Sequence, residues 1–493
     1  MFKKIILLTI FLILPYYKLF AIGNLFTIEL TPAFRLSSAN FNDEAINLFT
    51  IQNFFNQTRL SKFAFNYNYA PFQLYVDVDF LKQHIDVFTD NPSFSNFPYN
   101  DGFVGSINAT VPLQGFFAYR GDLINVIVGR SRWHFGAGDY SLVAGRDVPY
   151  FDGVWFSFNP QLSNGRLHFN FWAASDEQRA LEKFLAWQPE GALHLQQNSR
   201  WFFAHRFGFS RESWRLGLTE TMIFMGEPLN LSVISPLYLW HNLYMDSAAN
   251  VAITLDFEKI FTNQNIRLYA EFSLDDFQLP WEAIDSNPQA IALYLGADWQ
   301  IFDNGERFTA PRFDPFAQTI TMDNFAFDGG LVVTLQALWA SRFIWGRSQE
   351  LPLGKFTLFK NIHDGNNGVI EHYLAFPYGG DNIYLKAGAE WQNSQFFVTG
   401  SLGVLLQGND AAKVTGYLNR NHPEPQAVHI WSEETARNWA YSGLAHTMLL
   451  VNSTVHYALT HYASAYTSLN SRLVLNDFSQ SSALFELGVF LRF

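Results

Sequence analysis

The densest group of side chains that could do chemistry lies in residues 129–147, which read GRSRWHFGAGDYSLVAGRD. Arginine binds carboxylates through paired hydrogen bonds, and an aromatic ring can stack on a sugar face. These residue types favour contact with an acidic sugar. The alternative is a structural arginine–aspartate cluster that fixes an inward loop. The residues concerned are Arg130, Arg132, Trp133, His134, Asp139, Arg146 and Asp147.

A second group lies in residues 227–279. Asp275 and Asp276 could bind a divalent cation or act as acid and base. Adjacent aspartates at the end of a strand also form solvated turns. Trp240 and His241 could line a ligand site, although a tryptophan here also suits the aromatic girdle of a membrane barrel.

Catalysis and nucleic-acid binding receive little support. The chain has no cysteine, no Gly-x-Ser-x-Gly elbow and no His-Glu-x-x-His motif. Its formal net charge of −12 disfavours a phosphate-binding surface, which needs excess positive charge. We predict a non-catalytic protein with no cofactor, no metal ion and no nucleic-acid partner.

The first residues have the layout of a secretory signal. Lys3 and Lys4 precede an apolar run from Ile5 to Leu14, and Ala21 offers a small residue for cleavage. The run is shorter than the ~20 residues that a membrane helix needs. We predict a cleaved signal peptide at 1–21 and one barrel domain at 22–493.

The rest of the chain alternates between apolar and polar residues. Phe72, Leu74, Val76, Val78 and Phe80 are separated by Gln73, Tyr75, Asp77 and Asp79, and the same period recurs in 251–258, 266–274 and 383–391. Successive strand residues point to opposite faces, so each segment has one apolar face and one polar face. A soluble β-sandwich and a membrane β-barrel both give this pattern.

Three features favour an all-β, antiparallel transmembrane barrel. Several segments match the ~9–11 residues of a membrane-crossing strand. Aromatic residues make up 17% of the chain, as aromatic girdles require. The last segment alternates up to Phe493 and resembles the terminal strand that outer-membrane barrels present to their assembly machinery. We predict about 18 strands, with 16 as the alternative, and inner plug elements.

The stretches between strands, including 131–150 and 302–328, are rich in Asn, Asp, Gly and Pro and are predicted to be surface loops. Residues 175–190 form the one clear helical segment, because acids lie in its first turn and Pro189 ends it.

The two regions, residues 129–147 and 227–279, resemble parts of the Wzi-type capsule-assembly outer-membrane proteins. The resemblance covers roughly residues 120–280 and rests on two sets of residues. The first set is Gly129 and Arg130 followed by an aromatic and a Gly-x-Gly; the second is Pro236, Asn250, Leu268, Tyr269, Asp275 and Asp276. At 135–138 the chain reads Phe-Gly-Ala-Gly where the family commonly has Trp-Gly-Pro-Gly. The resemblance implies an 18-stranded barrel, closed by inner elements, that helps hold polysaccharide at the cell surface.

We therefore predict a bacterial outer-membrane barrel that binds or anchors surface polysaccharide. Its partners would be membrane lipid, lipopolysaccharide and the barrel-assembly machinery. A porin or substrate-specific channel is the alternative, because polar inward faces suit a water-filled pore as well as a plugged lumen. A barrel enzyme is the third hypothesis.

Overall fold

The computed structural model describes residues 25–37, 61–80, 114–148, 150–177, 180–182, 199–225, 240, 249–276, 289–312, 319–321, 327, 329–345, 356–361, 369–409, 417–418, 439–477 and 481–493. The predicted signal peptide at 1–21 lies outside these residues. The strands are β1 (Phe26–Leu30), β2 (Ala33–Ser37), β3 (Ser61–Tyr69), β4 (Phe72–Phe80), β5 (Gln114–Arg120), β6 (Ile124–Ser131), β7 (Trp133–His134), β8 (Phe151–Phe158), β9 (Gln161–Leu162), β10 (Gly165–Ser175), β11 (Arg200–Arg211), β12 (Trp214–Met225), β13 (Ala249–Phe261), β14 (Ile266–Asp276), β15 (Ala290–Phe302), β16 (Ile320–Thr321), β17 (Gly330–Ala340), β18 (Thr357–Asn361), β19 (Val369–Tyr373), β20 (Asn382–Gln392), β21 (Phe396–Gly408), β22 (Tyr417–Leu418), β23 (Leu444–Thr460), β24 (Ala463–Val474) and β25 (Ser482–Arg492).

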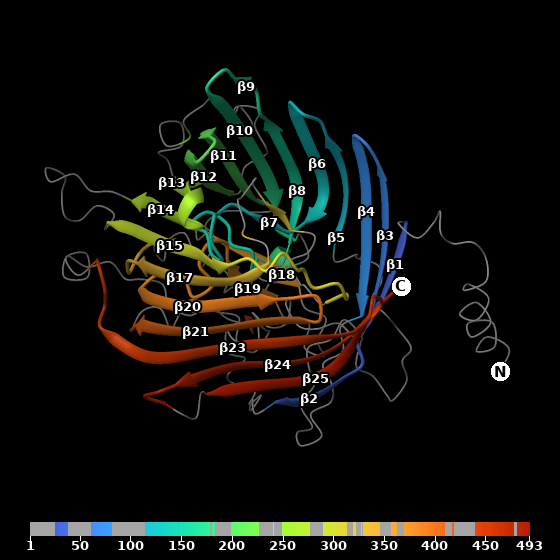
Figure 1. The fold of residues 1–493 in the computed structure, drawn as a ribbon. Helices are drawn as coiled ribbons and strands as arrows, with labels where there is room; N and C mark the ends of the chain where they lie inside the picture. The colour runs from blue at the N-terminus through green and yellow to red at the C-terminus, as the bar shows by residue number, and fades with distance from the viewer. Residues whose placement is uncertain are drawn as a thin grey trace, which may run out of the picture.

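Eighteen of the described strands form a closed antiparallel barrel (Figure 1). Each strand of the wall pairs with the next wall strand along the chain, from β1 and β3 round to β24 and β25. The ring closes where β1 pairs with β25, with Glu29 opposite Arg492. β2 continues the same edge along β25, and β9 extends the edge of β10. The predicted fold class and the favoured strand number are both confirmed.

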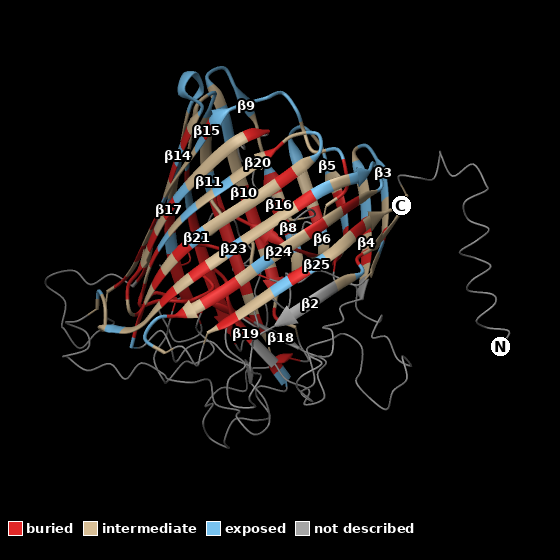
Figure 2. Cartoon of the chain, turned by 60° about the horizontal axis from the view of Figure 1, so that its bottom comes forward, coloured by how far each residue is buried: buried red, intermediate tan, exposed pale blue. Residues whose placement is uncertain are grey.

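The alternation in the sequence becomes the inside and outside of the wall. On β4, Phe72 and Leu74 are 43% and 40% exposed, whereas Tyr75 and Asp77, which point to the opposite face, are buried. Outward positions of the other strands are also large and apolar, so stripes of exposed and partly exposed residues run round the barrel in Figure 2. The polar face of each strand therefore turns into the lumen.

The two ends of the barrel differ. At one end the strands are joined by tight turns, such as residues 212–213 between β11 and β12 and residues 393–395 between β20 and β21. The start of β1 and the end of β25 lie at this short-turn end, where Phe493 and Ile28 exchange backbone hydrogen bonds of 2.9 Å. At the opposite, long-connection end, 41 residues (341–381) separate β17 from β20 and 35 residues (409–443) separate β21 from β23 in the sequence.

Helical structure is sparse in the described part of the chain. Residues 180–182 are helical, but Ser175 still belongs to β10, and residues 183–190 of the predicted helix lie outside the described ranges. A short 3-10 turn, η2 (Thr262–Gln264), joins β13 to β14. None of the helices among the described residues has the length and apolar character that a membrane crossing requires.

Candidate functional site

Residues 132–148, which we call the inner segment, leave the wall after β6 and cross the lumen. Asp139 lies 2.5 Å from the Lys386 ammonium on β20 and accepts a 3.1 Å hydrogen bond from Gln336 on β17. In the ring of eighteen, β20 is the ninth strand from β6 and therefore faces it across the lumen. The prediction of a surface loop at 131–150 is wrong, because this stretch folds inward and spans the barrel.

Wall residues of β14 hold the inner segment by its backbone. The Glu271 carboxylate accepts hydrogen bonds from the Leu142 amide at 2.6 Å and from the Ser141 hydroxyl at 3.3 Å. The Arg267 guanidinium donates to the Ala137 carbonyl. Gly138 allows this close approach, because a Cβ there would collide with the rings of Tyr294 and Tyr269 in the wall.

The aromatic residues of the inner segment belong to the core. Trp133 is 0% exposed and stacks on Phe151 with ring centroids 4.6 Å apart. Its Nε1 donates to the Ser131 hydroxyl at 2.8 Å. The ring centroids of Phe135 and Trp172 lie 4.3 Å apart. These rings contribute to the largest buried cluster, in which residues of the inner segment pack against inward residues of the wall.

The arginines predicted to bind a ligand are in structural contacts. Arg130 forms two hydrogen bonds of 2.6 and 2.9 Å to Asp152 and lies over the Tyr150 ring. Arg132 is 0% exposed, and its carbonyl accepts a 2.8 Å hydrogen bond from the Ile320 amide. Arg146 pairs with Asp139 at 2.5 Å and keeps 35% of its side chain exposed.

Burial and ion pairing set the protonation of the inner segment. Burial, and next the nearby Arg146 cation, lower the pKa of His134 to about 4, although the hydrogen bond of its ring to the Gly138 carbonyl acts in the opposite direction. Burial alone would raise the pKa of Asp139, but the Arg146 and Lys386 cations outweigh it and hold that pKa below its usual range. Burial raises the pKa of Asp147.

A second element enters the lumen from the short-turn end. The connection between β15 and β17 carries β16, which pairs in parallel with β7 of the inner segment. On the way, the Pro311 carbonyl accepts a 2.6 Å hydrogen bond from Ser464 on β24. The Arg312 guanidinium lies 3.5 Å from the Phe397 ring centroid on β21. Residues 310–312 and 319–320 therefore lie inside the barrel, where a surface loop was predicted, whereas residues 303–306 form an exposed turn at the rim.

The second predicted group is not brought together. Trp240 packs against the outer face of the wall, where it stacks on His205 at 4.2 Å and its amide donates to Glu220 at 3.1 Å. Asp275 points into the lumen and accepts a 3.1 Å hydrogen bond from the Trp345 amide. His241 and the side chain of Asp276 lie outside the described residues.

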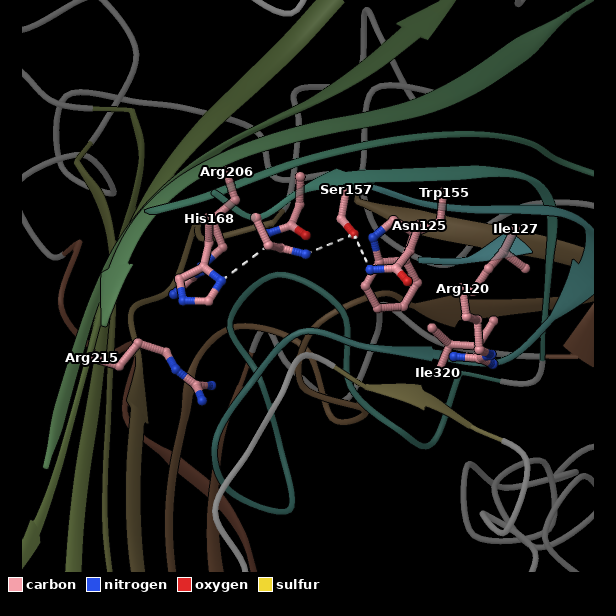
Figure 3. A pocket seen from close by; sticks show the side chains of 11 residues that line it. Arg120, Asn125, Ile127, Trp155, Ser157, His168, Arg206, Arg215 and Ile320 are labelled. Carbon is pink, nitrogen blue, oxygen red and sulfur yellow. Dashed lines mark hydrogen bonds between the residues drawn. The ribbon is translucent and has the colours of Figure 1, made fainter. Parts of the chain in front are cut away.

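One cavity was not predicted. It lies inside the barrel and is lined by inward side chains of β6, β8, β10, β11 and β12, together with Arg120 and Ile320 (Figure 3). Its volume is about 140 Å³. The lining residues occupy alternate strand positions, so the period of the sequence places each one inward. The sequence does not fix which of them lie side by side.

Metal binding has no support in the described ranges, where no three His, Asp or Glu side chains are grouped closely enough to hold an ion.

Comparison with known proteins shows a shared fold. No family model and no curated protein sequence matches the chain. Among solved structures, the chain is similar to Wzi of Escherichia coli, an outer membrane protein involved in group 1 capsule assembly and described as a carbohydrate-binding β-barrel. The two are 12% identical over 96% of this chain and 86% of that one, with a TM-score of 0.53. The likeness therefore bears on the fold of nearly the whole chain, where the sequence resemblance covered about a third.

Two further structures are similar at lower TM-scores. OccK3 (OpdO) of Pseudomonas aeruginosa is 6% identical over 97% of this chain and 99% of that chain, with a TM-score of 0.44. The outer membrane channel DcaP of Acinetobacter baumannii is 7% identical over 95% of each chain, with a TM-score of 0.37.

Proposed function

We propose that this protein is an outer-membrane barrel that binds or anchors surface polysaccharide without catalysis. The outward side chains of the wall, such as Leu335, Leu385 and Leu402 at 56%, 54% and 49% exposed, suit contact with membrane lipid and lipopolysaccharide. On this proposal, the short-turn end, where β1 starts and β25 ends, faces the periplasm, as is usual for such barrels, and the long-connection end faces outward. β25 would be the strand that the assembly machinery binds.

The observation that carries the proposal is the inner segment. It crosses the lumen between opposite strands and is bonded to Glu271, Arg267 and Lys386 of the wall. A general porin needs a continuous aqueous passage, which such a segment obstructs. A binding role fits better, because the segment presents charged groups in the lumen. Asp139 and Arg146 keep 22% and 35% of their side chains exposed and would hydrogen-bond to an acidic sugar.

Conductance in planar lipid bilayers tests the obstructed lumen. The purified protein is expected to show no large, steady openings, because the Asp139–Lys386 ion pair and the hydrogen bond from Leu142 to Glu271 hold the inner segment against the wall. An empty-micelle preparation serves as the blank. Steady porin-like openings would overturn the proposal in favour of the channel alternative.

A binding assay tests the second part of the proposal, that the protein binds surface polysaccharide. The protein in detergent is incubated with immobilised acidic and neutral bacterial polysaccharides, and Arg146→Ala is compared with Arg307→Ala. Arg307 is a partly exposed arginine at the short-turn end that pairs with Asp303 and donates to the Glu306 carbonyl of its own loop. We expect Arg146→Ala to weaken binding of the acidic polymer about ten-fold, the value of one charged hydrogen bond. Failure to bind any polymer would contradict the proposal, and release of reducing ends would revive the enzyme hypothesis.

A further inference from the structure

The luminal cavity opens towards the short-turn end. A second, wider pocket of about 430 Å³ lies beside it, between the β9 hairpin and the β11–β12 turn. The two pockets share His168 of β10 and Arg215 of β12. The cavity and the rim pocket are therefore neighbours, with these two side chains between them.

Positive charge is concentrated around these two pockets, although the chain as a whole has a formal net charge of −12. The two linings contain one acidic residue, Glu212, and five arginines: Arg120, Arg166, Arg206, Arg211 and Arg215. A cleft lined by one sign of charge raises the local concentration of oppositely charged solutes. The two linings therefore favour anions over cations.

Neighbouring carboxylates outside the two linings compensate part of this charge. Asp256 holds Arg206 through two hydrogen bonds of 3.0 and 2.6 Å. Glu258 lies 3.6 Å from Arg215 but 2.6 Å from Arg267, which is the closer of its two cations. Among the described residues, the side-chain contact of the Arg120 guanidinium is a 3.2 Å hydrogen bond to the neutral amide of Gln73.

The cavity also offers hydrogen bonds suited to hydroxyl groups. Asn125 and Asn159 both donate to the Ser157 hydroxyl, at 3.1 and 3.2 Å, and Asn159 in turn contacts His168 at 3.1 Å. Figure 3 shows this chain of side chains along one wall of the cavity. Trp155 completes the lining with an aromatic ring, and its buried Nε1 has no hydrogen-bond partner among the described residues.

We propose that the cavity binds a single sugar acid, a small polyhydroxylated carboxylate that enters from the short-turn end. Arginine forks match a carboxylate, amides and hydroxyls match sugar hydroxyls, and the ring of Trp155 is an apolar wall. A volume of about 140 Å³ is below the ~300–1,000 Å³ of sites for drug-sized ligands, which excludes a polymer. The proposal does not depend on polysaccharide binding at the inner segment; it takes from the proposed function only that this end faces the periplasm.

Isothermal titration of the full chain in detergent with glucuronate, glucose and acetate tests the site. Glucuronate is expected to bind at least ten-fold more tightly than glucose or acetate, because only glucuronate has both the charge and the hydroxyls. Arg215→Ala and Trp155→Phe are each expected to weaken glucuronate binding about ten-fold, whereas Arg307→Ala, at the same end but outside both linings, leaves it unchanged.

Three results would overturn the site: no glucuronate binding, equal affinity for glucose, or equal binding by all three variants. Heat-modifiable migration on gels confirms that each variant is folded before titration. Polysaccharide binding without glucuronate binding would reject this site and leave the proposed function standing. The converse result would support the site and reject the proposed function.

Discussion

Trp133 illustrates how the surroundings of a residue decide its role. The sequence offers it as a stacking platform for a sugar, but the ring is 0% exposed and lies between Phe151 and Phe135. We expect Trp133→Ala to destabilise the barrel by about 3–5 kcal/mol, the cost of removing a large core ring. Trp133→Phe keeps the stacking, loses the bond to Ser131 and should cost about 1 kcal/mol.

Urea unfolding in detergent, followed by tryptophan fluorescence, measures both variants. Loss of ligand binding by Trp133→Ala with unchanged unfolding midpoints would contradict the core assignment.

His134 makes the inner segment sensitive to acid. Its pKa falls from 6.5 to about 4 on burial, near the charged groups Arg146, Asp139 and Arg267. Between these two values the unfolded chain binds a proton that the folded chain does not, so stability is full above pH 6.5 and is lost as the pH falls. The loss between pH 7.5 and pH 5 is about 2 kcal/mol.

Urea midpoints at the two pH values check this, with His134→Gln as the comparison. The variant removes the titrating group, so its midpoint should change less with pH than that of the parent protein. His372, which is also buried with a pKa of about 4, continues to contribute in both proteins. An identical pH dependence for parent and variant would refute the role of His134.

At the scale of elements, the inner segment can pack closely against the wall because Gly138 has no side chain. A Cβ at Gly138 would meet the Tyr294 and Tyr269 rings, so Gly138→Val must push the segment off β14 and β15. We expect a loss of about 1–3 kcal/mol in stability and new openings in planar bilayers. Gly388→Ala is the matched control, because a Cβ there meets its nearest atom at an ordinary 3.5 Å. If the folded Gly138→Val protein produces no openings in planar bilayers, the inner segment does not close the lumen.

The elements differ in how far the sequence predicts them. For β4 and β14, the alternation of apolar and polar residues within each strand is enough to predict which side chains point outward and which point inward. The prediction does not require knowing which strands are neighbours. The path of the inner segment does not follow, since turn-forming residues suit an inward loop as well as a surface loop. Its direction is set by partners more than a hundred positions away, such as Glu271 for Leu142 and Lys386 for Asp139.

At the scale of the whole molecule, the cavity arises from register. Asn125 on β6 lies opposite Ser157 on β8 in the ladder. His168 on β10 lies opposite Gly208 on β11, which brings its ring within 2.7 Å of the Ser210 hydroxyl two residues further along. A shift of one residue in a ladder would turn every side chain to the other face. One sequence gives the period of each strand but not the offsets between strands. Inward residues were therefore predictable, and the site they form was not.

The closed ring also fixes which side chains meet lipid if the barrel lies in a membrane, and neighbouring positions of β21 separate the two faces. Leu402 is 49% exposed on the outer wall, and Ser401 faces the lumen beside Gly388 and Lys386. Both lie near the middle of the strand. Arginine at a lipid-facing position near the bilayer centre costs about 2–4 kcal/mol, whereas arginine in a hydrated lumen costs far less.

We therefore expect Leu402→Arg to lower the free energy of unfolding in liposomes by about 2–4 kcal/mol and Ser401→Arg to lower it by less than about 1 kcal/mol. Urea titration of the folded band on cold gels measures both. Equal cost for the two arginines in liposomes would mean that lipid does not contact the outer wall, and the proposed membrane location would fall with it.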